Sequence, residues 1–225
     1  MAKLQWDATS KRLYETGTDR GVLFPVDSTG AYGTGVAWNG LQKVTESPDG
    51  AEETSLYADN QKYLGLTSVE NWKGKIEAYT YPKEFAICDG SAELAPGVTV
   101  GQQTRAPFGM TYRTLVGNDT QGNDYGYKIH IIYGMKAQPS ERAYASVNNS
   151  PEAVTLSWSV TATPVPMPNL KPAAEIVINA TAIPIDILHK LEALLYGDDT
   201  NEPKLPSPVE IAALLASAPA QNPQG

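Results

Sequence analysis

The chain has 225 residues, of which 41% are hydrophobic and 19% charged, and it carries a formal net charge of −8 at pH 7. A chain of this length can bury a sizeable core as one domain without disulfide support, and its single cysteine, Cys88, excludes an internal disulfide. The acidic balance argues against a sequence-specific nucleic-acid reader, because affinity for a phosphate backbone comes largely from Lys and Arg.

The first 34 residues are predicted to form an N-terminal arm outside the core. Their apolar residues alternate poorly, and Gly17, Gly21, Pro25 and Gly30 interrupt the pattern. Two short strands are expected directly afterwards, over residues 33–41 and 43–47.

An acidic segment comes next, over residues 44–60. It contains no basic residue and five acidic ones: Glu46, Asp49, Glu52, Glu53 and Asp59. The segment is either a solvated loop or a loop that contacts another subunit. Contact surfaces are also favoured by the 12 Tyr against 3 Phe, because tyrosine is enriched at protein interfaces.

Alternation of apolar and polar residues predicts the longer strands, each with one buried and one exposed face. The clearest covers residues 153–163, with an apolar face of Val154, Leu156, Trp158, Val160 and Ala162. Similar patterns predict strands over 73–81, 108–116, 127–133 and 174–180. In the strand 127–133, Lys128 and His130 share the predicted polar face. Because these strands follow one another without crossover helices, an antiparallel arrangement is expected.

The loop "GNDTQGNDYG", residues 117–126, clusters Asp, Asn and Gly between two of these strands. Calcium loops share this composition, but the EF-hand spacing and its terminal Glu are absent. Asn and Asp also favour turns, because their short side chains bond to nearby backbone. The segment is therefore interpreted as a turn between two strands.

Two helices are predicted late in the chain. Residues 184–196 place Ile187, Leu188, Leu191, Leu194 and Leu195 on one stripe. Residues 208–216 form a short second helix that begins with a capping box, in which Ser207 is followed three residues later by Glu210. The expected fold class is mainly β (α+β): an antiparallel β-sandwich or barrel with one flanking helix and a short C-terminal helix.

Catalytic, cofactor-binding and metal-binding motifs are not found, so no enzyme and no cofactor are predicted. The chain contains no phosphate-binding loop, no dinucleotide fingerprint and no nucleophile elbow. One Cys and two distant His residues do not supply a usual zinc ligand set. His130 and His189 are interpreted as surface or interface residues, because no motif gives either one a carboxylate partner.

From about Gly35 onward the chain resembles the major tail proteins of long-tailed, non-contractile bacteriophages. The resemblance depends on a series of short words spread over nearly the whole chain: "LYADN", "EAYTYP", "CDGS", "LAPGV", "GQQTR", "GNDTQGNDYGYK", "NNSPEA" and "EPKLPSPVEIAALL". Together they are far more specific than any motif considered above. The first 30 residues and the Pro-, Ala- and Gln-rich ending do not take part.

The resemblance implies a phage tail-tube fold and a structural subunit of the tail tube. Six copies would form a ring, and rings would stack head to tail into a hollow conduit through which double-stranded DNA passes without specific binding. Other implied partners are the tape measure protein, the tail terminator and the distal tail or baseplate proteins. The implied location is the virion tail, assembled in the bacterial host cytoplasm, with no membrane partner. Two alternatives remain open: another virion protein, such as a capsid decoration protein, or a carbohydrate-binding β-sandwich.

Under this interpretation the chain divides into an arm (1–34), a tail-tube β-domain (35–197, with its flanking helix at 184–196) and a C-terminal part (198–225). The last part would hold a linker, the helix 208–216 and a flexible tail. The acidic segment and its continuation to Trp72 are expected to contact the next ring or subunit, with Arg105 and Arg113 as partners for its carboxylates. The candidate contact residues are Glu46, Asp49, Glu52, Glu53, Tyr57, Asp59, Trp72, Arg105 and Arg113.

Overall fold

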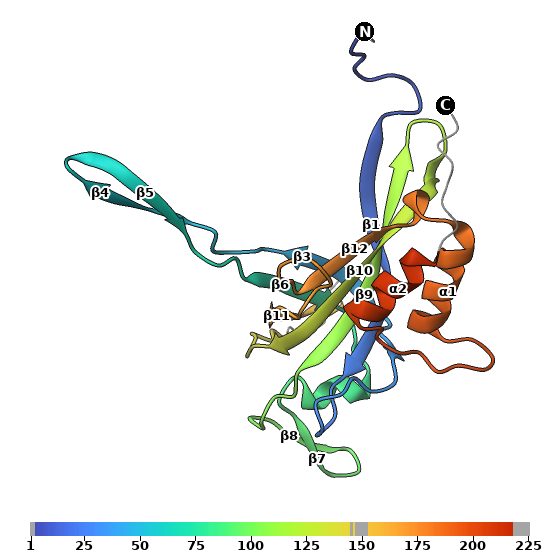
Figure 1. Ribbon diagram of the computed structural model, residues 1–225. Coiled ribbons are helices and arrows are strands. Elements are labelled where there is room, and N and C mark those ends of the chain that lie inside the picture. Colours follow the sequence, from blue (N-terminus) through green and yellow to red (C-terminus); the bar gives the residue numbers. More distant parts are fainter. Residues whose placement is uncertain (1–2, 145, 147–152, 218–225) are drawn as a thin grey trace.

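The computed structural model describes residues 3–144, 146 and 153–217 and is mainly β (Figure 1). Its antiparallel strands and its helices have the following bounds: β1 (Leu13–Pro25), β2 (Val36–Ala37), β3 (Leu41–Glu46), β4 (Glu53–Ala58), β5 (Gln61–Thr67), β6 (Trp72–Ala78), η1 (Lys83–Ile87), β7 (Ala92–Ala95), β8 (Val98–Val100), β9 (Phe108–Asn118), β10 (Gly122–Ala137), β11 (Leu156–Ala162), β12 (Glu175–Asn179), η2 (Ala180–Ala182), α1 (Ile185–Tyr196) and α2 (Pro208–Ala216).

One large sheet forms the body. Its strand order is β2-β1-β9-β10-β11-β6-β3, and β12 pairs with β10 beside that path. The long strand β10 serves two neighbours, since its residues 128–132 pair with β12 and its residues 135–137 pair with β11. Between them lies Gly134, whose positive φ of 59° suits glycine and marks the irregularity in the ladder.

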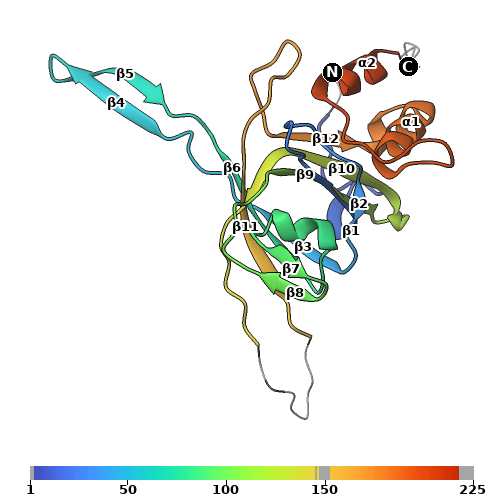
Figure 2. The ribbon, with the colours of Figure 1, turned by 90° about the horizontal axis from the view of Figure 1, so that it is seen from below.

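The sheet curls on itself, as Figure 2 shows from below. The amide of Trp38 donates to the carbonyl of Gly21 at 2.8 Å, which brings the chain just before β3 against β1. The space inside the curl is filled by apolar side chains from β9, β6 and β11, including Met110, Ile76 and Trp158. The short helix η1 adds Phe85 to this inner core, fully buried.

The outer face of β1, β10 and β12 carries a second core beneath the two α-helices (Figure 1). Leu188, Leu191 and Leu195 of α1 and Ile211 of α2 are buried there. The predicted helical stripe is therefore confirmed, although Leu194 is only half-buried. The predicted capping box of α2 is present as well, because Ser207 and Glu210 each bond to the other's backbone amide.

The predicted N-terminal arm over residues 1–34 is wrong for its central part. Residues 13–25 form β1, which pairs with β9 along its length. Leu23 points into the inner core, while Val22 and Phe24 face the second core under the helices. Residues 21–24 of the strand are thus buried between the two cores, residues 13–17 are exposed, and the strand belongs to the body.

The predicted turn at 117–126 is confirmed. Strand β9 ends at Asn118 and β10 begins at Gly122. The side-chain oxygen of Asn118 accepts from the amides of Thr120 and Gln121 at 3.1 and 2.6 Å, which is the local bonding that makes Asn favourable in turns. Part of the predicted flexible tail, residues 218–225, lies outside the described residues. Across the residues that are described, no helix has the length and apolarity needed to span a membrane.

Cys88 follows η1 and is fully buried in the inner core. Burial, together with the neighbouring charge of Asp89, raises the pKa of its thiol to about 12. Because only the thiolate reacts, the native thiol should react about a thousandfold more slowly with Ellman's reagent near pH 8 than an exposed thiol. The measurement is the absorbance time course for native protein, with the same protein in urea as the control. Native and unfolded chains that react at equal rates would contradict the buried position.

Candidate functional site

The segment between β3 and β6 forms a long projecting arm, residues 47–71, which ends in the hairpin of β4 and β5 (Figures 1 and 2). Its two chains stay paired along the way. Ser47 donates to the carbonyl of Lys73 at 2.8 Å, and Asp49 and Asn71 exchange two backbone hydrogen bonds of 3.0 and 2.7 Å. The arm is therefore a continuation of the β3–β6 pair that leaves the body.

One face of the hairpin is apolar. Leu56 lies opposite Leu64, and Thr54 opposite Leu66, so these four side chains share a face. The three leucines are 41%, 47% and 52% exposed, and Tyr57 and Tyr63 near the tip are 72% and 76% exposed. An isolated two-stranded hairpin is marginally stable in water and gains little by exposing leucine. The arm therefore has the composition of a surface that packs against another molecule.

All five acidic residues of this segment are exposed, and two of them have a lysine partner nearby. Lys62 of β5 pairs with Glu53, and Lys73 of β6 pairs with Asp49. Glu52 and Asp59 stay exposed on the arm. The acidic contact segment stays a prediction, and the structure adds that the arm also has an exposed apolar face and two charge pairs.

The predicted partners Arg105 and Arg113 are both engaged within the chain. Arg113 makes two hydrogen bonds to Asp19 at 2.7 and 2.6 Å, and its guanidinium lies over the ring of Tyr127. Arg105 lies 3.4 Å from the buried Asp89. Both arginines thus have acidic partners within the chain, and their contact with the acidic segment of a neighbouring subunit stays a prediction.

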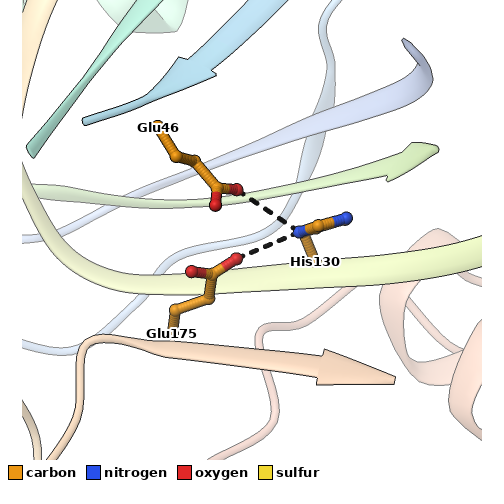
Figure 3. A group of neighbouring side chains, drawn as sticks. All are labelled: Glu46, His130 and Glu175. Atoms are coloured by element: carbon orange, nitrogen blue, oxygen red, sulfur yellow. Dashed lines mark hydrogen bonds and ion pairs between the residues drawn. The ribbon is translucent and has the colours of Figure 1, made fainter. Parts of the chain in front are cut away.

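The root of the arm contains a cluster of polar side chains that the sequence patterns did not predict (Figure 3). His130 of β10 lies between Glu46, the last residue of β3, and Glu175, the first of β12. Its Nδ1 atom is 3.0 Å from Glu175 Oε1 and 3.4 Å from Glu46 Oε1. Because β3 ends at Glu46 and the arm begins at the next residue, this cluster lies at the point where the arm leaves the body.

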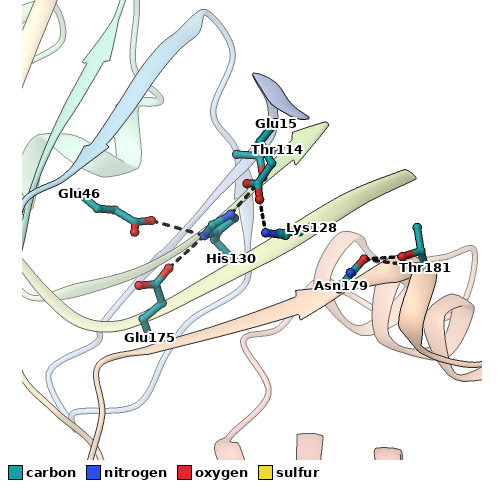
Figure 4. Close-up of polar contacts among 8 residues, drawn as sticks. All are labelled: Glu15, Glu46, Thr114, Lys128, His130, Glu175, Asn179 and Thr181. Carbon is teal, nitrogen blue, oxygen red and sulfur yellow. Dashed lines mark hydrogen bonds and ion pairs between the residues drawn. The ribbon is translucent and has the colours of Figure 1, made fainter. Parts of the chain in front are cut away.

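Each member of the cluster is held by a further contact. Thr114 lies 3.1 Å from the Nε2 atom of His130 (Figure 4), and the ring of Tyr112 stacks on the imidazole at 4.6 Å. The hydroxyl of Tyr112 donates to Glu46. Trp72, a predicted contact residue, is instead buried, and its indole N–H donates to Glu175 Oε2 at 3.0 Å. The predicted contact residues Glu46 and Trp72 therefore meet at one partly buried cluster of the subunit.

Charge pairing dominates the electrostatics of this cluster. Burial alone would lower the pKa of His130, but hydrogen bonds to Glu175 and Glu46 and their negative charges raise it to about 9. The hydrogen bond from His130 lowers the pKa of Glu46 to about 2, against the opposing effect of burial. Burial and the neighbouring Glu46 carboxylate raise the pKa of Tyr112.

His130 was predicted to be a surface or interface residue, and that interpretation is wrong. The residue is only 8% exposed, because both faces of β10 are covered here. Its two carboxylate partners come from strands far away in the sequence, so no local spacing could have identified them. His189, in contrast, lies exposed on α1 as expected.

No protein-family model matches the chain, and no curated protein matches it in sequence. The assignment of a function therefore depends on the geometry of the arm and the body, and on the resemblance of the short sequence motifs to phage major tail proteins.

Proposed function

We propose that the protein is a structural subunit of a bacteriophage tail tube, in which hexameric rings stack head to tail into a conduit for genome delivery. The observation that carries the proposal is the arm, residues 47–71, which projects from the body. Its apolar face is not covered by any other element of the described chain. A subunit that acts alone has no use for such an element, whereas a subunit that meets copies of itself does.

The body suits the same role. Its curled antiparallel sheet carries two helices on one outer face, as the tail-tube resemblance implies for this fold. A propagating assembly needs a heterologous interface, in which one surface of a subunit meets a different surface of the next. The arm supplies one half of that interface, and its receiving surface lies on a neighbouring subunit. Tape measure, terminator and distal tail proteins would cap and fill the resulting tube.

The test is negative-stain electron microscopy of the purified chain at increasing concentration, combined with light scattering after gel filtration. Rings with sixfold symmetry, or tubes built from them, are the expected result. A closed dimer, or a ring with a different symmetry and with free arms, would contradict the proposal.

A further inference from the structure

At the root of the arm, two carboxylates approach the same ring nitrogen of His130, and the Glu46 oxygen among them also accepts from the hydroxyl of Tyr112. A ring nitrogen carries at most one hydrogen, and that hydrogen points at one acceptor. Two carboxylate oxygens nevertheless approach Nδ1 of His130, at 3.0 and 3.4 Å (Figure 3). Ligand atoms from all three residues lie within 4.8 Å of one another. The groups thus converge on a single small volume.

The spacing is compatible with a metal coordination sphere as well as with hydrogen bonding. In a tetrahedral complex with metal–ligand bonds of about 2.0–2.1 Å, neighbouring ligand atoms lie about 3.3 Å apart. The observed separations from Nδ1 to the two oxygens fall on either side of that value. Small side-chain rotations would therefore place a cation between the three groups.

Neighbouring side chains form hydrogen-bond contacts with the three proposed ligands. In metalloproteins such contacts orient the residues that bind the metal. Thr114 lies within hydrogen-bond distance of Nε2 of His130, which leaves Nδ1 facing the carboxylates. Trp72 donates to the second oxygen of Glu175, whereas Tyr112 donates to Oε1 of Glu46, the same oxygen that faces Nδ1 of His130 (Figure 4 shows the ligands with Thr114). The side chain of His130 is 11% exposed, whereas the side chain of Glu46 is 34% exposed and leaves a path from solvent.

We propose that Glu46, His130 and Glu175 form a binding site for a divalent transition-metal cation, for which Zn²⁺ is the best fit. One imidazole nitrogen and two carboxylate oxygens suit Zn²⁺, while Mg²⁺ and Ca²⁺ prefer oxygen ligands alone. Water would fill the remaining position on the exposed side. The site does not depend on the proposed function, but its location at the end of β3 means that a bound cation would fix the root of the arm.

The test is calorimetric titration of the full chain with Zn²⁺ alone, near pH 8 and without chelators, because the cation must displace a proton from the imidazole. We expect one cation per chain. His130→Gln should abolish this binding, and His189→Gln, which changes the only other histidine, should leave it unchanged. Thr114→Val, which keeps the side-chain shape and removes the contact to Nε2, should weaken binding roughly 10–100-fold.

Circular dichroism of each variant establishes that it is folded. If His130→Gln does not fold, the Zn²⁺ affinity of Thr114→Val tests the site instead. The visible absorption of bound Co²⁺ gives an independent readout of the ligand geometry. Failure of the wild-type chain to bind Zn²⁺ or Co²⁺, or equal binding by Thr114→Val and wild type, would overturn the site. Neither result bears on ring formation, which is measured separately by microscopy.

Discussion

Replacing Leu56, Leu64 and Leu66 together with serine is expected to abolish assembly into rings or tubes while the body of the protein stays folded. The three side chains form the apolar face of the arm and are each about half exposed in the subunit. Burying the remaining half of the three leucines of one arm contributes on the order of 3 kcal/mol in total. This corresponds to about a hundredfold in the association constant of that contact. The measurement is negative-stain microscopy and light scattering, compared with the wild-type chain at equal concentration.

A matched control lies on the opposite face of the same hairpin. Ser55 and Thr67 point away from the leucines, as the alternation along the two strands requires. Ser55→Ala with Thr67→Ser should assemble as the wild type does. Both variants should unfold at the wild-type urea concentration, because β4 and β5 contact mainly each other. Normal tubes from the triple serine variant would show that the arm does not form the contact.

The strands with one exposed face were predictable from sequence, because alternation along a strand reports the burial of one face. Strand β11 is the clearest example, with Trp158 and Val160 buried and Ser159 exposed. Strand β1 was not predicted from alternation, for two physical reasons. Its consecutive residues Val22, Leu23 and Phe24 enter two different cores and therefore do not alternate with polar residues. Irregularities in its ladder with β9, next to Gly17 and Arg20, further disturb the pattern.

The candidate site was even less accessible from sequence. Its groups come from β3, β10 and β12, and Glu175 is 45 residues from His130. Only the closure of the sheet brings these side chains together. In the sequence, His130 is simply a histidine close to Lys128 on an apparently polar strand face, and nothing in that pattern indicates the two carboxylate partners. The charge pairs of the arm were hidden from the sequence for a similar reason, because Lys62 and Lys73 reach Glu53 and Asp49 across strand ladders that the acidic stretch alone did not reveal.

Replacing Trp158 with alanine is expected to be among the most destabilising changes in the body. The indole is 1% exposed and makes edge-to-face contacts with Trp38, Tyr81 and Phe85, with ring centroids 5.7, 5.5 and 5.2 Å away. Truncating a buried tryptophan costs about 3–5 kcal/mol through lost contacts and the cavity left behind. Its N–H also donates to the buried Asp89 at 3.1 Å, so the truncation removes a partner from a buried carboxylate.

The size of this effect can be separated into packing and hydrogen bonding. Trp158→Phe keeps most of the ring contacts but removes the hydrogen bond to Asp89, so it should cost about 1–3 kcal/mol. Trp6→Ala, at a side chain that is 76% exposed, should change the free energy of unfolding by less than about 0.5 kcal/mol. Urea unfolding followed by far-ultraviolet circular dichroism measures all three without relying on tryptophan fluorescence. If Trp158→Ala lost no more stability than Trp6→Ala, the aromatic cluster around Phe85 could not be the centre of the inner core. The packing of η1 and Cys88 against the body would then have to depend on other contacts than those with Trp158.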